Sequence, residues 1–176
     1  MNIVLIGYRG SGKSTVGRKL ADRLQMKFVD TDDCIEERYK ASINDIVELR
    51  GWDHFRMLEK GIIEEISKKD HFVIAPGGGA VVDTDNVMAL RKNGFIVWLK
   101  ADVQVLLQRM VNDPQTATGR PSLTGKGALE ELKEVLALRE GFYERASEVQ
   151  VDTSLLDVDG VANKVLSILE GKAVRV

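Results

Sequence analysis

The sequence predicts an α/β fold in which a five-stranded parallel sheet is flanked by helices in three layers. Two observations predict this class. Short apolar runs, typical of strands buried on both faces, alternate with segments of helical period five times along the chain. No internal repeat, low-complexity tract or linker divides the 176 residues, so we expect one domain over 1–176. This repeated alternation favours parallel strands with helices covering both faces.

The first half of the chain is expected to contribute three strands. The run NIVLIG at 2–7 is a strand, and the segment at 13–25 is a helix because Val16, Leu20 and Leu24 lie on one helical face. Further strands are predicted at 26–30 and 71–75, and helical segments between them at about 33–39, 43–50 and 53–68.

The second half continues the alternation. Apolar runs predict strands at 94–99 and 148–152, and helical period predicts helices at 102–111, 128–146 and 157–171. The segment at 112–127 combines proline and glycine with few apolar residues, so it is predicted to be a loop. In open parallel sheets, ligands bind at the carboxyl ends of the strands, so we expect the functional residues directly after each strand.

The composition is that of an ordinary soluble globular protein. Lys and Arg total 25 and Asp and Glu total 27, so the net charge of −2 suggests no general affinity for nucleic acid or membranes. Cys34 is the single cysteine, which fits a reducing compartment. No apolar stretch reaches the length of a membrane span, and the N-terminus is typical of a first strand rather than a signal peptide. We therefore expect a cytoplasmic protein and a monomer.

A phosphate-binding loop follows the first strand. GYRGSGKST at 7–15 matches G-x-x-x-x-G-K-[ST] and lies between a predicted strand and a predicted helix, as the motif requires. Its glycines let backbone N–H groups surround phosphates, Lys13 would reach the β- and γ-phosphates, and Ser14 would ligate Mg²⁺. A chance glycine turn is the alternative. The predicted residues for ATP binding are Gly10, Ser11, Gly12, Lys13, Ser14 and Thr15.

Acidic residues follow the second strand, in the run DTDD at 30–33. A protein with this loop needs a carboxylate near its metal, usually at the end of a neighbouring strand, and Asp30 is the candidate. If the chain stays extended, Asp32 points the same way as Asp30 and could orient an acceptor hydroxyl or take its proton. The alternative is that these residues, Asp33 above all, are solvated acids at a helix N-terminus.

Further candidates lie after the third strand and in the helices. PGGGAV at 76–81 lets the backbone approach a ligand closely, or forms only a turn from strand to helix. Arg56 and Glu59 share a helical face, a spacing that is more commonly a surface ion pair. Arg139 also lies in a predicted helix, and for it too the alternative is a surface ion pair. Arg120 lies in the longest loop, either as part of a lid that closes on the transferring phosphate or as an exposed side chain.

Aromatic and imidazole side chains carry weaker signals. His54 and His71 are isolated from each other and from Cys34, and no metal-ligand spacing is evident. Trp98 ends a predicted core strand and is interpreted as packing. Trp52 lies at a break between two helical segments, and its role is open.

Together these segments resemble the shikimate kinase family. The shared motifs are GYRGSGKST, FVDTDDCIE, SINDIVELRGWDHFRMLE, PGGGAVV, GRPSLTG and LREGFYERASEVQVDT, in the family's order over nearly the whole chain. The D-T-D, F-R-x-x-E, G-G-G and R-P elements together are more specific than the phosphate loop. The resemblance implies a P-loop kinase fold with a mobile lid. It also implies ATP-dependent phosphorylation of the 3-hydroxyl of shikimate, on the route to chorismate and aromatic amino acids.

The resemblance also implies roles for individual residues. Asp30 corresponds to the carboxylate on the magnesium side, and Asp32 to the acid that binds the shikimate hydroxyls and is the candidate base. Arg56 and Arg139 correspond to the arginines that hold the shikimate carboxylate, which suits bidentate pairing. The implied catalytic residues are Lys13, Asp32 and Arg120, and Arg120 is also expected to contact ATP. The implied metal ligands are Ser14 and Asp30. The implied acceptor-binding residues are Asp32, Arg56, Gly77, Gly78, Gly79 and Arg139.

Two features depart from the family pattern. Pro76 precedes the glycines where a small or apolar residue is more usual, which removes one N–H donor. The segment from Arg109 to Arg120 looks longer than in shorter members, so the match of Arg109 to the family's adenine-side arginine is loose. The resemblance further implies that 112–125 closes over ATP and that 33–60 moves with the acceptor.

Other functions are compatible with the phosphate loop. Gluconate kinases are similar but lack the combined motifs, and nucleoside monophosphate kinases generally use more arginines around a second nucleotide. A regulatory nucleotide-binding module without catalysis would be expected to lose Lys13, Asp32 or the lid arginine, and all three are present. Shikimate kinase activity is therefore the predicted function.

Overall fold

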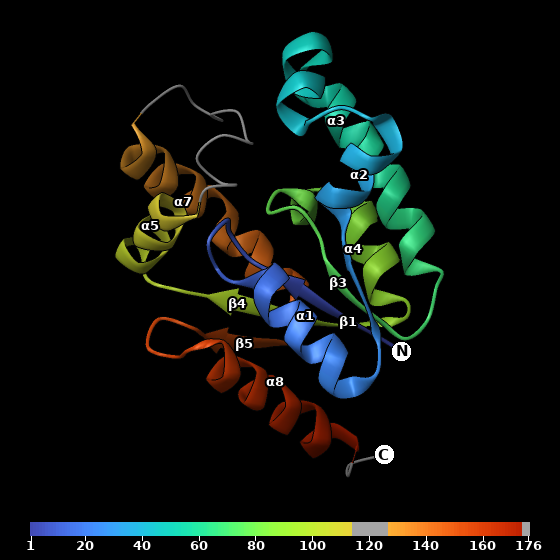
Figure 1. The fold of residues 1–176 in the computed structure, drawn as a ribbon, viewed down its shortest axis with the longest axis vertical. Helices are drawn as coiled ribbons and strands as arrows, with labels where there is room; N and C mark the ends of the chain where they lie inside the picture. Colours follow the sequence, from blue (N-terminus) through green and yellow to red (C-terminus); the bar gives the residue numbers. More distant parts are fainter. Residues whose placement is uncertain (114–126, 174–176) are drawn as a thin grey trace.

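A five-stranded sheet forms the centre of the computed structural model, which describes residues 1–113 and 127–173 (Figure 1). The strands are β1 (Asn2–Ile6), β2 (Lys27–Asp30), β3 (Phe72–Ala75), β4 (Gly94–Lys100) and β5 (Val149–Asp152). Their order is β2-β3-β1-β4-β5, and every pairing is parallel. The predicted parallel sheet is confirmed, and each strand differs from its predicted range by one residue at one end.

Helices connect the strands. They are α1 (Lys13–Leu24), α2 (Thr31–Tyr39), α3 (Ile43–Ser67), α4 (Thr84–Arg91), α5 (Val103–Asn112), α7 (Ala128–Ala146) and α8 (Val158–Ala173), with a short 3₁₀ turn η1 (Ala80–Val82). Helix α4 is absent from the prediction because it is short and buries only Asn86 and Leu90, too few residues to produce a helical period. The two helices predicted at 43–50 and 53–68 form one element, α3, that kinks at Gly51.

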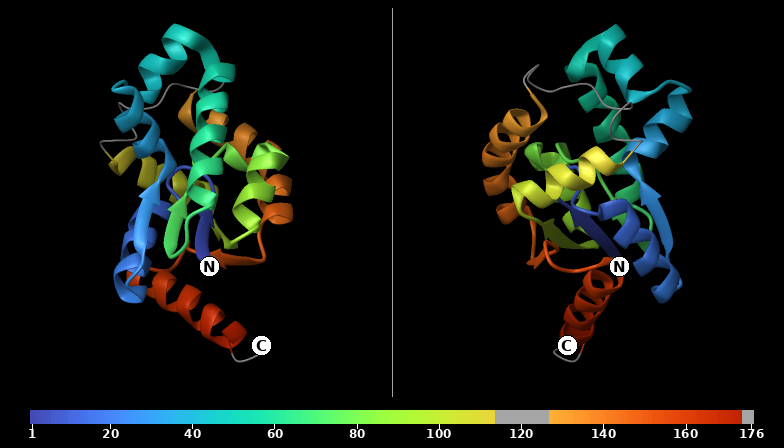
Figure 2. Two further views of the ribbon diagram at one scale, coloured as in Figure 1. Left: turned by 90° about the vertical axis from the view of Figure 1, so that its right-hand side faces the viewer. Right: turned by 60° about the vertical axis from the view of Figure 1, so that its left-hand side comes forward.

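The sheet is covered on both faces, which gives three layers (Figure 2). Ile3 and Leu5 of β1 belong to the core cluster that α1 and α8 cover, whereas Val4 and Ile6 belong to the cluster that α3, α4 and α7 cover. Successive strand residues point to opposite faces, so a strand buried on both sides must be apolar throughout. This requirement explains the unbroken run in β1.

The strand order places the segments that follow β1, β2 and β3 together at the carboxyl edge of the sheet. The phosphate loop follows β1, the glycine run 76–79 follows β3, and α2 follows β2. Because β3 pairs with both β1 and β2, the glycine run lies between the phosphate loop and the acidic segment. Asp30 therefore ends a strand that is not a direct neighbour of β1, since β3 separates the two strands.

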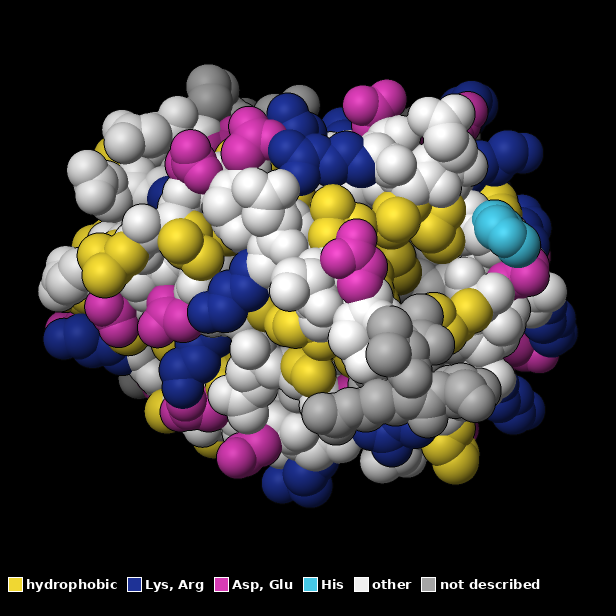
Figure 3. Space-filling view, turned by 90° about the horizontal axis from the view of Figure 1, so that it is seen from below, with side chains coloured by type: hydrophobic (Ala, Val, Ile, Leu, Met, Phe, Trp, Pro, Cys, Tyr) yellow, Lys and Arg dark blue, Asp and Glu magenta, His cyan; other side chains and the backbone are white. Residues whose placement is uncertain are grey.

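Charges are mixed on the face seen from below Figure 1, where acidic and basic side chains alternate over the surface (Figure 3). This distribution agrees with the small net charge of −2. Among residues 1–113 and 127–173, we find no helix that is both long enough and apolar enough to cross a bilayer.

Candidate active site

The phosphate loop has the backbone shape of an anion-binding site. Gly10 and Gly12 have φ values of 80° and 92°, a backbone conformation that residues with a Cβ atom rarely adopt. Gly12 precedes α1 and supplies no side-chain cap, so the first N–H groups of the helix point at the loop. Lys13 Nζ donates to the carbonyls of Gly7 at 2.9 Å and Tyr8 at 3.1 Å. The ammonium group is thus held at the loop.

Ser14 of α1 and Asp30 of β2 meet although β1, which leads into the phosphate loop, is not adjacent to β2. Ser14 Oγ donates to Asp30 Oδ2 at 2.7 Å, because the first turn of α1 lies over the end of β2. A hydroxyl and a carboxylate are the oxygen ligands that Mg²⁺ accepts, and this ion usually retains several waters. The donor set therefore fits magnesium. Among the described residues, no group of three or more His, Cys, Asp or Glu side chains forms a denser metal site.

Asp32 reaches the site by a different route from the one predicted. The chain does not stay extended after Asp30, because α2 begins at Thr31 and Asp30 is its N-cap, accepting from the Asp32 N–H at 3.0 Å. Asp32 therefore lies in the first helical turn, where it is only 6% exposed. Asp33 is exposed and pairs with Arg18 at 3.7 Å, so it fits the alternative of a solvated acid at a helix N-terminus.

A large cleft contains the predicted nucleotide-binding residues. Its volume is about 730 Å³, and the predicted residues that line it are Gly10, Ser11, Gly12, Lys13, Ser14, Thr15, Asp30, Asp32 and Gly77. Pro76 also lines it. The cleft continues to Arg109, which donates to the carbonyl of Thr153 at 2.7 Å and to its hydroxyl at 2.9 Å. Arg109 thus ties the end of β5 to the rim of the cleft, on the side predicted for adenine.

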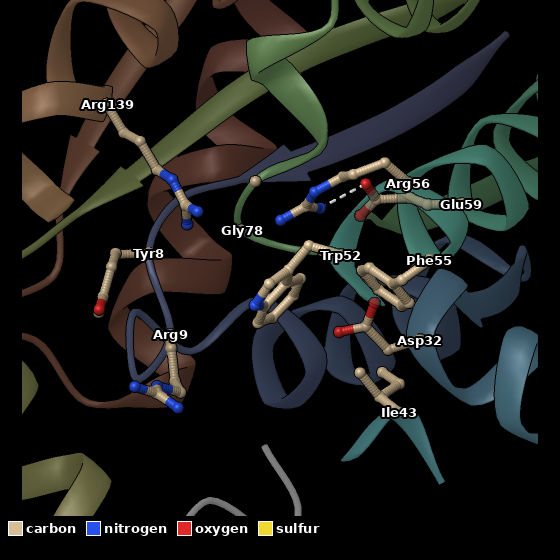
Figure 4. Close-up of a pocket in the computed structure, with 12 residues that line it drawn as sticks. Tyr8, Arg9, Asp32, Ile43, Trp52, Phe55, Arg56, Glu59, Gly78 and Arg139 are labelled. Atoms are coloured by element: carbon tan, nitrogen blue, oxygen red, sulfur yellow. Dashed lines mark hydrogen bonds and ion pairs between the residues drawn. The ribbon is translucent and has the colours of Figure 1, made fainter. Parts of the chain in front are cut away.

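A second pocket adjoins this cleft and gathers the predicted acceptor residues (Figure 4). Those residues are Asp32, Arg56, Gly77, Gly78, Gly79 and Arg139. Arg56 from α3 and Arg139 from α7 extend into the pocket from opposite sides of Gly78 (Figure 4). Asp32 lines both the pocket and the nucleotide cleft. The two cavities therefore meet at this carboxylate.

The run of glycines is explained by charged side chains that approach its backbone closely. A Cβ atom at Gly77 would lie 2.5 Å from Glu59 Oε1 and 2.8 Å from Asp32 Oδ1, and one at Gly79 would lie 2.8 Å from Arg56 Cζ. Side chains at these positions would displace the charged groups of the pocket. Gly77 N–H donates to Thr31 Oγ1 at 3.1 Å, so the run stays anchored to α2 although Pro76 lacks an N–H.

Arg56 and Glu59 form a buried pair, so the surface alternative is wrong for them. Arg56 Nη1 donates to Glu59 Oε2 at 2.5 Å, and Glu59 is 0% exposed while Arg56 is 35% exposed. Burial raises the pKa of Glu59 to about 7, although the Arg56 charge opposes this rise. Glu59 Oε1 makes no hydrogen bond within the described residues. The carboxyl therefore fixes the guanidinium at the wall of the pocket.

Several lining residues were not predicted. Tyr8, Arg9, Ile43 and Phe55 join the pocket, as does Trp52, whose role was open. Trp52 packs edge-on against Phe55 at 5.8 Å between ring centroids. An aromatic pair before an arginine in a helix gives no sign of which face is buried, so sequence reasoning could not assign these rings.

Arg9 is the missed residue with the clearest chemistry. It lines both cavities, and its Nη2 lies 3.3 Å from Oε1 of the buried Glu131 in α7. Its place inside the phosphate-loop motif was the available signal, because that loop faces the ligand throughout. Arg120, the predicted lid residue, lies outside the described residues.

Comparison with known proteins identifies one family. A family model described as shikimate kinase matches residues 9–170. Shikimate kinase 2 of Photorhabdus laumondii is 40% identical over 141 residues, which is 80% of each chain. A shikimate kinase from Acinetobacter baumannii in complex with shikimate has a TM-score of 0.90 and 32% identity, over 97% of this chain and 93% of that one.

More distant similarity concerns the fold only. A gluconokinase from Sinorhizobium meliloti has a TM-score of 0.60 at 18% identity, over 99% of this chain and 94% of that one. The family match, by contrast, includes the phosphate loop from Arg9 onwards, the acidic segment, the glycine run and both pocket arginines. On this match and the 40% identity of the curated relative, the chain belongs to the shikimate kinase family.

Proposed function

We propose that this chain transfers the γ-phosphoryl group of MgATP to the 3-hydroxyl of shikimate, giving shikimate 3-phosphate and ADP. One observation carries the proposal beyond family membership. A cleft lined by the phosphate loop adjoins a pocket lined by two arginines, and Asp32 lines both. A donor phosphate and an acceptor hydroxyl held in the two cavities would meet beside this carboxylate, as in-line transfer requires.

The acceptor pocket suits a small hydroxylated carboxylate. Arg56 and Arg139 provide two guanidinium groups, each of which can bind a carboxylate bidentately. Glu59 restrains Arg56, so less freedom is lost when the acceptor binds. The glycine run brings the backbone of Gly77, Gly78 and Gly79 to the same pocket without side chains in the way.

Asp32 is proposed to act on the attacking hydroxyl. Its first-turn position in α2 and low exposure keep it aimed between the cavities. It would accept a hydrogen bond from the 3-hydroxyl and either orient it or take its proton as the oxygen attacks the γ-phosphorus.

The donor side would hold and neutralise the triphosphate. Lys13 is proposed to exchange its carbonyl partners for the β- and γ-phosphates when ATP binds. Ser14 and Asp30 would hold Mg²⁺, which neutralises phosphate charge when bound. Arg120 is proposed to add positive charge at the transferring group, and 112–125 to act as the lid.

The setting is part of the same proposal. We propose a monomer of one domain that works in the cytoplasm on ATP and shikimate. A single sheet that carries both cavities supports one domain, and a single cysteine suits a reducing compartment.

A coupled ADP-release assay with MgATP and shikimate tests the activity. Gluconate and nucleoside monophosphates serve as alternative acceptors, and we expect turnover with shikimate only. Asp32→Asn should reduce kcat by about 100-fold or more with little change in ATP binding, which is the usual scale for losing a general base. Glu37→Gln is the matched control, since Glu37 is exposed on the same helix and lines neither cavity. Turnover with gluconate instead of shikimate, or near-normal kcat in Asp32→Asn, would contradict the assignment.

A further inference from the structure

Tyr143 is a fully buried polar residue to which the proposed mechanism gives no role. It lies in α7 four residues after Arg139, so the two side chains share a helical face. The ring is 0% exposed and stacks on Trp98 at the end of β4, with centroids 5.6 Å apart and planes at 26°. This packing holds the ring in one orientation.

The hydroxyl of Tyr143 is directed at the glycine run. It donates to the carbonyl of Gly78 at 2.5 Å. Gly78 also lies against the phosphate loop, since a Cβ atom there would be 3.3 Å from Gly7 O, 3.6 Å from the Tyr143 hydroxyl and 3.7 Å from Arg9 N. The central glycine is therefore packed against the phosphate loop and hydrogen-bonded to the Tyr143 hydroxyl.

The peptide unit that begins at Gly78 transmits this restraint. A trans peptide is planar, so fixing the Gly78 carbonyl also fixes the N–H of Gly79 on the opposite side of the plane. Gly78 and Gly79 both line the acceptor pocket. Glycine has the widest choice of backbone conformations, so a run of three needs an external restraint to stay in one of them.

Tyr143 also lies near Arg139, four residues before it on α7. Burial raises the pKa of the Tyr143 phenol, and the Arg139 guanidinium lowers it, so the two groups lie within interaction distance. The raised pKa keeps the hydroxyl protonated at neutral pH, as donation to Gly78 requires. One side chain thus contacts the glycine backbone and neighbours the arginine on the far wall of the pocket.

We propose that Tyr143 is a positioning residue for the acceptor, whose hydroxyl holds the Gly78 carbonyl and so keeps the glycine backbone aligned with Arg139. This inference rests on the proposed function, because it concerns the site assigned to shikimate. Tyr143 itself does not line the pocket, so it acts through the residues it holds.

The test is Tyr143→Phe, which keeps the ring and removes only the hydroxyl. We expect the KM for shikimate to rise about 5- to 150-fold, the scale for leaving one buried acceptor unsatisfied, while kcat falls less and the KM for ATP stays within about twofold. Shikimate titrations followed by tryptophan fluorescence should show the same loss of affinity, since Trp52 lines the pocket.

Val165→Ala is the control for a purely structural effect. Val165 is fully buried in α8, among the side chains on the opposite face of the sheet. We expect it to lower the melting temperature and leave the KM for shikimate unchanged. An unchanged KM in Tyr143→Phe, or equal KM changes in both variants, would overturn the positioning role.

A double-mutant cycle provides a second readout. If Tyr143 acts partly by aligning Arg139, the losses of shikimate affinity in Tyr143→Phe and Arg139→Ala should be less than multiplicative when combined. Multiplicative losses would contradict the link to Arg139. Wild-type protein that releases no ADP with shikimate would overturn the proposed function itself, whereas an active wild type with a normal Tyr143→Phe variant overturns only the present inference.

Discussion

Arg139 and Arg56 enter the acceptor pocket from different helices, and each is set by its own surroundings (Figure 4). Arg56 is paired with the buried Glu59, which neutralises part of its charge. Arg139 lies beside Tyr143 on α7. Two guanidinium groups that face one pocket favour an anionic ligand, and their individual contributions can be separated by substitution.

We predict that Arg139→Ala impairs binding of the carboxylated acceptor. Loss of a hydrogen bond to a charged group costs about 1.5–3 kcal/mol, so kcat/KM for shikimate should fall about 10- to 150-fold while the KM for ATP changes little. Steady-state kinetics with each substrate varied will measure this. Arg145→Ala is the matched control, because Arg145 is on the same helix but stacks on Phe142 and lines neither cavity. An unchanged KM and kcat/KM for shikimate in Arg139→Ala would remove it from the site.

Glu59 predicts a pH dependence of stability. Its pKa is about 7 in the folded protein against 4.5 for a free side chain, so the folded state holds this proton more tightly than the unfolded chain. The stabilisation is complete below pH 4.5 and is lost as the pH rises through 7, by roughly 3 kcal/mol at most. Glu59→Gln cannot titrate, so relative to it the wild type should lose free energy of unfolding between pH 5 and 8.

Urea denaturation at several pH values will measure this difference. Glu64→Gln is the control on the same helix, since Glu64 is exposed and pairs with Lys68 at the surface. Between pH 5 and 8, the free energy of unfolding should fall by the same amount in the wild type and in Glu64→Gln. If the wild type and Glu59→Gln also follow parallel curves from pH 5 to 8, the buried carboxyl does not titrate as described.

Among the elements, α3 contributes most to the acceptor pocket. Its regular geometry is interrupted at Gly51, where φ is 81° and ψ is 168°. Trp52, Phe55 and Arg56 follow directly after this kink and line the pocket. Only glycine adopts this conformation readily. The angle between the two parts of α3, before and after the kink, therefore depends on Gly51 alone.

We predict that Gly51→Ala destabilises the fold and weakens acceptor binding. Apart from the adjoining residues and the local helix backbone, no described atom lies within 4 Å of a Cβ at Gly51, so the cost, about 1–3 kcal/mol, arises from the backbone conformation. Gly61→Ala is a matched control in the same helix, where a Cβ is equally unobstructed and φ is not positive. There we expect stabilisation of about 0.5–1 kcal/mol and an unchanged KM for shikimate. Thermal unfolding and kinetics of both variants will decide, and equal effects would contradict a special role for the kink.

Over the whole molecule, the site is assembled at the carboxyl edge of the sheet from the loops after β1 and β3 and the start of α2 after β2, together with α3 and α7. The sheet provides a fixed base, because both of its faces are packed. The elements that project beyond this edge are α2 and the first half of α3 on one side and α5 and α7 on the other (Figure 1).

We predict that the two substrates order different segments. Shikimate should slow amide hydrogen exchange in 33–60, and a non-hydrolysable ATP analogue with Mg²⁺ should slow it in the phosphate loop and in 112–125. Exchange in α4 should stay constant, since α4 lines neither cavity. Mass spectrometry of peptic fragments gives this resolution. Uniform slowing, including α4, would indicate general stabilisation rather than movement of these segments.

Local patterns identified most of the elements but fewer of the contacts between them. Each strand was placed to within one residue because an apolar run bounded by turns is a local signal. The expectation of an extended chain through Asp32 was wrong, because Asp30 caps α2 and the helix begins at the next residue, Thr31. The surface alternative for Arg56 and Glu59 failed because burial depends on what packs against a helix, which spacing does not reveal.

By itself, the sequence determined the α/β class, the phosphate loop and its place between a strand and a helix. Each of these follows from residues close together in the chain. Only the tertiary structure decided that β3 lies between β1 and β2, that Asp32 stands where the two cavities meet, and that Glu59 and Tyr143 are buried behind the acceptor pocket. These features depend on which distant segments pack together, and the packing energy that selects them is shared among residues far apart in sequence.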